Sequence, residues 1–488
     1  MKKFIIKTTV IILSLGVFWA CSDDFVDVDS PDPNSEDFFN PEEDYQDALV
    51  GAYDLLQTTY INVMLGEIAS DNTLAGGESA TDVIGIQEID NMTHTPVNQQ
   101  LRDIWGWMYS GVNRANYILE FQDKTDFPGK DEVLAQARFL RAYYYFELVK
   151  WFGDVPLKVD ERIQFGDQFD IDRTPKAEVY KQIEEDLIYA AANLPGTQSE
   201  AGRITRGAAQ ALLGKAYLYQ DKFPEAAQVL DQVIGSGNYD LVPDYASIFE
   251  LEGENNMESV FEVQYSDKEG AGFGCLQCSE GNVAVGFNGI RNYTGPEFGS
   301  GFSFNVPTQE AFDAFEEGDL RRDVAVLDIE AWSEETGATY STGYEHTGFF
   351  NRKYIARQGG LNTPDANLTN PNNYRSIRYA DVLLMAAEAY NRGGLDDGLA
   401  RMYLNKVRLR ANLPDVPESV AGQDLTEVIW NERRVELMGE GHRFFDLVRT
   451  ERAAQNIDGF VPGKHEVFPI PSIEIELAGN RWEQNPGY

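Results

Sequence analysis

Apolar residues recur at intervals of three and four along much of the chain after about residue 41, which is the spacing of helices with one buried face. The pattern begins in residues 42–60 and repeats in residues 102–121. A helical stripe that carries aromatic rings usually packs in a core, so we expect Trp105 to be buried and leave the role of Trp107 open. The positions that share these two faces are Tyr45, Leu49, Ala52, Tyr53 and Leu56, and then Trp105, Met108, Val112, Ala115 and Leu119.

Two later segments carry the spacing of paired helices of the tetratricopeptide type. In residues 210–234, small residues at Gly214 and Ala226 stand where two helices would approach each other closely. A looser unit spans residues 379–411 and is one residue longer between its halves. The sequence therefore predicts a mainly α fold built on a scaffold of helical hairpins, with long irregular loops and a few short strands.

Between these units, at about residues 250–375, the pattern changes. Residues 259–267 alternate apolar Phe261, Val263 and Tyr265 with polar Glu262 and Gln264, as a half-buried strand does. A long stretch dense in glycine and aromatic residues follows, and long loops of this kind in a compact protein usually carry function. We interpret this segment as a variable ligand-binding insert within one domain that covers residues 41–488.

The first twenty residues read as a secretory signal, with a basic start and an apolar run that ends in Ala20. Cys21 follows at once, in the position of the lipid-modified cysteine of bacterial lipoproteins, so we expect lipid anchorage at Cys21. Residues 21–40 are rich in Asp, Ser and Pro and read as a flexible acidic stalk. No later run is long enough to cross a bilayer as a helix.

The net charge of the chain limits the classes of molecule that it can bind. The chain has 40 Lys and Arg against 80 Asp and Glu, a formal net charge of −40. Such a surface repels phosphate, so nucleic acid and anionic membrane faces are poor partners, while neutral ligands, cations and basic proteins remain open.

Signatures of catalysis are absent. The chain contains no GxSxG, HExxH or phosphate-binding GxxxxGK motif and no EF-hand spacing. Paired carboxylates could serve a glycosidase, but with 80 acids some pair is always available. We therefore expect no enzymatic activity, no cofactor and no metal site; calcium held by loop carboxylates stays open, without residues that specify it.

Cys275 and Cys278 form a CxxC in the glycine-rich stretch. A secreted compartment favours a disulfide between them, free thiols are the main alternative, and zinc would need two further ligands.

Four long blocks of the sequence can be compared with known families. They are ARFLRAYYYFELVKWFGDVPL from Ala137, RYADVLLMAAEAYN from Arg378, NKVRLRANLP with IWNERRVELMGEGHRFFDLVR up to Arg449, and the tail VFPIPSIEIELAGNRWEQNPGY. Taken in order, these blocks resemble the SusD/RagB family of outer-membrane nutrient-binding lipoproteins.

The third block also has a structural interpretation. Around Phe444 and Phe445 it carries charged residues that we interpret as ion-paired scaffold: Glu432, Arg433, Arg434, Glu440, Arg443 and Asp446. His442 lies among them, where a lone histidine is more often structural than a ligand.

This resemblance implies a SusD-like fold with four tetratricopeptide-like hairpins and an irregular ligand-binding face. It also implies a place at the outer membrane, facing the exterior, where members cover a SusC-like TonB-dependent transporter and pass it an oligosaccharide. Some branches of the family handle peptides instead. Non-catalytic glycan capture is the leading hypothesis, peptide capture is the alternative, and a surface glycosidase is a third.

A sugar offers an apolar CH face and a rim of hydroxyls, so its binding site needs flat aromatic rings beside polar side chains. The glycine-rich stretch and the segment around residues 331–346 supply these types, and the family also uses the segment before the second long helix. The resulting candidates for ligand binding are Asp71, Asn72, Asn91, His94, Phe273, Phe287, Arg291, Tyr293, Phe298, Trp332, Tyr340 and Tyr344.

Overall fold

The computed structural model describes residues 38–164, 166–167, 170–268, 270, 272–359 and 367–488. The predicted signal, Cys21 and most of the predicted stalk lie outside these residues. Within them, no helix is long and apolar enough to cross a membrane.

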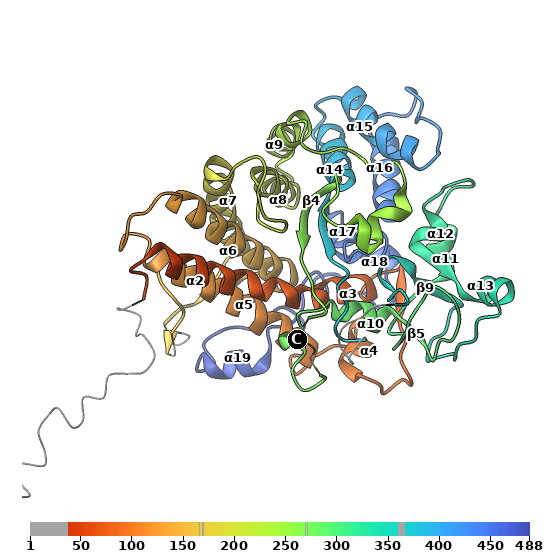
Figure 1. Ribbon diagram of the computed structural model, residues 1–488, viewed down its shortest axis with the longest axis horizontal. Helices are drawn as coiled ribbons and strands as arrows, with labels where there is room; N and C mark the ends of the chain where they lie inside the picture. The colour runs from red at the N-terminus through yellow and green to blue at the C-terminus, as the bar shows by residue number, and fades with distance from the viewer. Residues whose placement is uncertain (1–37, 165, 168–169, 269, 271, 360–366) are drawn as a thin grey trace, which may run out of the picture.

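Helices dominate the fold, as the apolar spacing predicts. Consecutive helices pack against each other, and in Figure 1 α7, α8 and α9 lead toward α14, α15 and α16 at the top of the view. The longer helices are α2 (Glu42–Asp54), α3 (Tyr60–Ile68), α5 (Gln99–Glu120), α6 (Lys130–Phe152), α7 (Lys176–Asn193), α8 (Arg206–Leu218), α9 (Phe223–Gly235), α14 (Tyr379–Arg392), α15 (Asp397–Arg410) and α16 (Gln423–Glu436).

The predicted helical faces are buried. On α5, Trp105 is 3% exposed and its ring lies 5.1 Å from that of Phe152 and 6.2 Å from that of Trp482. Trp107 is half-buried, with its ring 6.2 Å from Tyr60. On α2, Tyr53 is partly buried, and its hydroxyl donates to Gln136 and accepts from the backbone N–H of Ile204.

The close approach predicted at Gly214 is present between α8 and α9. A Cβ atom at this position would lie 2.6 Å from side-chain atoms of Leu230. No larger side chain fits there without separating the two helices, so the small residue sets their distance.

Shorter elements fill the insert and the connections, and the strands of the described segments form two-stranded sheets. In Figure 1 the teal part of the insert, with α11, α12 and α13, lies at the right of the helical scaffold. The short helices are α4 (Ile84–Asp90), α10 (Val283–Asn288), α11 (Gln309–Asp313), α12 (Arg322–Ala325), α13 (Ile329–Thr336), α17 (Arg443–Arg449), α18 (Ala453–Asn456) and α19 (Ser472–Leu477). The strands are β1 (Thr73–Ala75), β2 (Val155–Pro156), β3 (Arg173–Thr174), β4 (Ser259–Val263), β5 (Ile290–Arg291), β6 (Ser300–Gly301), β7 (Asn305–Pro307), β8 (Val326–Asp328), β9 (Phe349–Asn351) and β10 (Tyr374–Arg378).

The strand predicted from alternation is β4, but it is buried on both faces. Glu262, expected on a solvent face, is 3% exposed. Its carboxylate accepts hydrogen bonds from Asn255 and Asn373 and faces Arg375 on the paired strand β10. Local alternation could not reveal this because the covering residues come from distant segments.

Buried ion pairs tie the insert to the C-terminal helices. Arg378, 1% exposed, contacts Glu258, Glu436 and Glu440 at 2.6 to 2.8 Å. Arg321 joins the same cluster through Glu436 at 2.9 Å. In the block predicted around Phe444, Arg433 contacts Asp446 at 3.2 Å and Asp381 at 2.7 Å, and Arg443 contacts Asp71 at 2.7 Å. The predicted ion pairs are therefore present, with some partners supplied by other parts of the chain.

His442 belongs to this scaffold. It is 9% exposed, and burial, together with the nearby Lys215, lowers its pKa to about 3. The side chain is therefore neutral at physiological pH, consistent with a structural role.

Candidate ligand-binding site

Four of the sequence-predicted aromatic residues build a small core inside the insert. Phe298 is 0% and Tyr293 is 7% exposed. The half-buried Trp332 donates from Nε1 to the Tyr293 hydroxyl at 2.9 Å, and its ring lies 5.3 Å from Phe298. Tyr340 packs against the same cluster. These residues shape the insert from within, and Phe298 presents no surface to a ligand.

A second group forms a line of aromatic rings that runs from the interior to the surface. Phe287 is 6% exposed, and its ring lies 5.2 Å from Phe304 and 5.8 Å from Phe302. Phe302, which is half-buried, lies 5.6 Å from Phe273. Phe273 itself is 66% exposed. We call Phe273 and Phe302 the aromatic ridge, because they are the members of this line that reach solvent.

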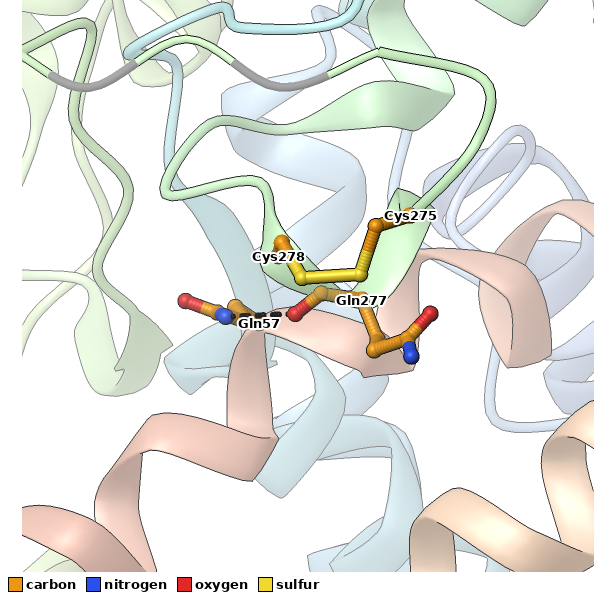
Figure 2. Close-up of a disulfide and its surroundings, with 4 residues drawn as sticks. All are labelled: Gln57, Cys275, Gln277 and Cys278. Atoms are coloured by element: carbon orange, nitrogen blue, oxygen red, sulfur yellow. Dashed lines mark hydrogen bonds between the residues drawn. A yellow bond between two sulfur atoms is a disulfide. The ribbon is translucent and has the colours of Figure 1, made fainter.

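The loop that carries Phe273 is held at several points. The structure joins Cys275 and Cys278 by a disulfide, and Gln57 of the helical scaffold donates to the carbonyl of Gln277 at 2.9 Å (Figure 2). The backbone N–H of Cys275 donates to the carbonyl of Gly272 and closes a turn around Phe273. This anchoring reduces the conformational freedom that an exposed ring would lose on binding a ligand.

Polar groups lie beside the ridge. Arg291 donates from Nη2 to the carbonyl of Phe302 at 2.8 Å and lies 3.7 Å from Asp82. Both side chains keep partial exposure, 18% for Arg291 and 30% for Asp82. A cation and a carboxylate next to exposed rings can donate to and accept from hydroxyl groups.

Gly77 brings a third segment to the same place. Its φ of +106° and the 2.9 Å that would separate a Cβ from the Phe304 ring both favour glycine. Its carbonyl accepts from the backbone N–H of Tyr344, which fixes the loop that carries this half-buried tyrosine. Residues that are far apart in sequence, Asp82, Arg291 and Tyr344, are thus brought to one region.

A cleft of about 460 Å³ lies beside β1, whose Thr73 and Leu74 line it. Its walls come from the turn after α3, the end of α4, the start of α11 and the segment after α18, and the side chains include Asp71, Asp90, Asn91, Glu310 and Asp458. Among the described residues that line it there is no Phe, Tyr or Trp. It can therefore offer hydrogen bonds but no stacking surface.

Asp71 is committed to the scaffold. Its carboxylate contacts Arg443 at 2.7 Å and Arg434 at 3.2 Å. Burial alone would raise the pKa of Asp71, but Arg443 and Arg434 hold it below its ordinary value. Asn72 is 0% exposed, and its side-chain oxygen accepts a hydrogen bond from Arg434 at 2.8 Å, so Asn72 also serves the scaffold rather than facing the cleft. Asn91 is exposed at the rim of the cleft, with its amide donating to the carbonyl of Gln87.

His94 lies apart from both the ridge and the cleft. It is 2% exposed, bonds the Tyr488 hydroxyl at 2.7 Å and packs on Phe468. Burial and the nearby His465 lower its pKa to about 3. The residue therefore anchors the C-terminus as a neutral side chain.

Phe302, Asp82 and Asp90 are site residues that the sequence did not single out. Asp90 lines the cleft, and its Oδ2 accepts from the backbone N–H of Ala75 at 3.0 Å. Burial and the neighbouring Glu345 raise the pKa of Asp90 to about 7. In the part of the chain that the structure describes, no group of three His, Cys, Asp or Glu side chains could hold a metal ion.

Comparison with known proteins gives a consistent picture. Residues 323–488 match the SusD family, and residues 24–218 match a family described as starch-binding and associating with the outer membrane. SusD-like protein P2 of Formosa agariphila is 28% identical over 536 residues, covering 100% of both chains. The starch-binding protein SusD of Bacteroides thetaiotaomicron is 23% identical, covering 86% of this chain and 84% of that protein.

Solved structures match over nearly the same length. A laminarin-binding SusD-like protein is 35% identical with a TM-score of 0.85, covering 92% of this chain and 100% of that one. The surface glycan-binding protein A from Bacteroides thetaiotaomicron, solved in complex with laminarihexaose, is 29% identical with a TM-score of 0.81, covering 91% of this chain and 99% of that one.

Proposed function

Because the chain belongs to the SusD family, we propose that it captures neutral oligosaccharides or polysaccharides and presents them intact to an uptake system. Like the relatives named for binding, it is a binding protein rather than an enzyme. The observation that carries the proposal is the exposed aromatic ridge, Phe273 and Phe302, beside Arg291 and the Tyr344 loop. The rings stack on the apolar face of a sugar, and the polar side chains hydrogen-bond its hydroxyls.

Charge supports an uncharged ligand. The whole chain carries a formal net charge of −40, and Asp71, Asp90, Glu310 and Asp458 line the cleft beside β1. Uronic-acid and sulfated glycans would approach against this field. Since two structural neighbours are described with laminarin or laminarihexaose, a laminarin-type glucan is the first ligand to test.

The place of action follows from the N-terminal sequence and the family. We infer that residues 1–20 are removed as a signal peptide, that Cys21 is lipid-modified, and that residues 21–40 tether the binding domain, residues 41–488, to the outer face of the outer membrane. Attached acyl chains hold a protein at a membrane without a spanning helix. A SusC-like TonB-dependent transporter would receive the captured glycan.

Affinity gels with immobilised glycans test this function. The wild-type chain should be retarded by laminarin and not by an anionic glycan such as alginate. Phe273→Ala should weaken retention about 2- to 10-fold, the loss expected for one stacking ring. Leu409→Ala is the matched control, because Leu409 is 73% exposed but lies on α15, away from the site. Peptide binding without any glycan binding would favour peptide capture instead.

A further inference from the structure

The exposed ring of the aromatic ridge lies in a stretch of backbone with little intrinsic order. Phe273 is 66% exposed, and its ring lies 5.6 Å from that of Phe302. Gly272 and Gly274 flank it, and a Cβ atom at either position would have open space around it. Glycine leaves the backbone free to adopt many conformations. Packing on Phe302 and local backbone preference therefore hold this ring only weakly.

The segment that follows the ring supplies the missing order. The backbone N–H of Cys275 donates to the carbonyl of Gly272 at 3.0 Å. The disulfide from Cys275 to Cys278 then spans one turn of 3₁₀ helix, Leu276–Cys278. A single helical turn is unstable on its own, because it fixes several dihedral angles for one hydrogen bond. The covalent bond therefore maintains the turn that closes around Phe273.

The same turn is attached to the scaffold on its other side. Leu276, between the two cysteines, packs against the main core, and Gln57 donates to the carbonyl of Gln277 at 2.9 Å (Figure 2). Opening the disulfide leaves these two contacts in place but removes the covalent constraint on Cys275. The part of the loop that carries Phe273 then loses its link to the fixed end of the turn.

The disulfide is accessible and has no competing cysteine nearby in the sequence. Cys278 is exposed, and Cys275 is partly exposed. The chain contains three cysteines, and the third, Cys21, is the predicted site of lipid attachment. Within the binding domain the pair therefore has two states, bonded and reduced, without a third thiol to exchange with.

We propose that Cys275 and Cys278 are positioning residues of the glycan site and that their bond is a redox switch for capture. This inference rests on the proposed function, which places Phe273 against the sugar. In the bonded state the ring is held where a sugar face can stack on it. In the reduced state the loop has to be ordered when the ligand binds, and this ordering lowers the affinity.

The exchange needs an external dithiol, either a small molecule or a protein with two reduced cysteines. One of its thiolates attacks Sγ of Cys278, the more exposed sulfur, and the S–S bond breaks as Cys275 leaves as a thiolate. The second thiolate of the dithiol attacks the dithiol's own bonded sulfur and releases Cys278. Two electrons and two protons have then moved to the cysteines, and the dithiol has become a disulfide. A disulfide oxidant reverses the exchange.

The test uses a chain with Cys21→Ser, in which Cys275 and Cys278 are the only cysteines. Dithiothreitol therefore acts on their bond alone. Isothermal titration with laminarihexaose compares the air-oxidised and the reduced protein. The reduced protein should bind about 2- to 10-fold more weakly, which is the range expected for ordering one further side chain on binding. The loss should not exceed the loss caused by Phe273→Ala.

Reduction of Phe273→Ala separates a positioning role from a merely structural one. If the bond acts through the ring, reduction should change the affinity of this variant by less than about 1.5-fold. The double variant Cys275→Ser with Cys278→Ser should bind like the reduced protein, with or without dithiothreitol. Reduction should change the melting temperature by no more than about 2 °C, because the bond closes a loop of only a few residues.

Three results would overturn the inference while leaving glycan capture intact. They are equal affinity of the oxidised and reduced protein, an equal loss on reduction in Phe273→Ala, and free thiols at both cysteines in the air-purified protein, as detected by alkylation and mass spectrometry. If the double cysteine variant does not fold, reduction of the Cys21→Ser chain decides. Failure of the oxidised protein to bind any neutral glycan would remove the proposed function and this inference with it.

Discussion

Arg378 is the residue on which the scaffold's charged core depends most directly. Its guanidinium donates to Glu258, Glu436 and Glu440 and to the carbonyl of Glu436, at 2.6 to 3.0 Å. We consider the substitution Arg378→Met, which keeps a long side chain but removes every one of these bonds. The three carboxylates stay buried and lose their shared partner.

The expected loss of stability depends on the cations that still contact these carboxylates in the variant. Breaking a buried ion pair by removing one partner costs about 3–5 kcal/mol. Here Glu436 keeps Arg410 and Arg321, and Glu440 keeps Lys353, so we expect the lower end, about 3 kcal/mol. With an unfolding entropy of about 2.1 cal/mol/K per residue over roughly 450 residues, this corresponds to about 3 °C in melting temperature.

Differential scanning calorimetry at pH 7 measures this shift. Arg322→Met is the matched control, because Arg322 and its partner Asp323 are 40% and 73% exposed. A surface pair contributes about 0–1 kcal/mol, so the control should melt within about 1 °C of the wild type. A melting temperature of Arg378→Met that equals or exceeds that of the wild type would refute the reasoning, since burial of the charges would then outweigh their attraction. Glycan affinity at 20 °C should be the same in both variants.

Three further predictions concern packing, the insert and acid. Trp105→Ala should lower the free energy of unfolding by about 3–5 kcal/mol in urea titration, because the ring is buried against Phe152 and Trp482; an unchanged midpoint would contradict this. Trp332→Ala should lower the melting temperature by several degrees, because the variant loses both the packing of the ring and the hydrogen bond to Tyr293. An unchanged melting temperature together with weaker glycan binding would instead show that Trp332 is a ligand-binding residue. Burial alone would raise the pKa of Asp446, but Arg433 and Arg449 hold it below its ordinary value. The ionised carboxylate therefore stabilises the fold above about pH 4, and this stabilisation is lost as the pH falls further. Urea midpoints that do not decrease from pH 5 to pH 3 would contradict this prediction.

Much of the scaffold could be predicted from the sequence because its determinants are local. Helical spacing identified the buried face of α5 including Trp105, and a small residue at Gly214 indicated where α8 and α9 meet. The block around Phe444 indicated buried ion pairs, because charged side chains that lie among aromatic rings need partners of opposite charge when they are buried. The identity of the partners, such as Arg321 or Arg378, depends on the tertiary fold and was not readable.

The candidate site was less predictable, because the same residue types serve packing and binding. Nothing in the sequence separates Phe273, which is exposed, from Phe298, which is fully buried a short distance along the same stretch. Trp332 was a natural candidate for stacking, and in the structure it is half-buried and packs against the core of the insert. Asp90 gave no signal beside its neighbour Asn91, because its place in the wall of the cleft is visible only in three dimensions.

The most direct test of the account is isothermal titration of the wild-type chain with laminarihexaose, followed by chromatography of the sugar after prolonged incubation. The account predicts saturable binding and recovery of the hexasaccharide unchanged. Shortened oligosaccharides, or the absence of binding to laminarihexaose and to every other neutral glycan tried, would contradict it.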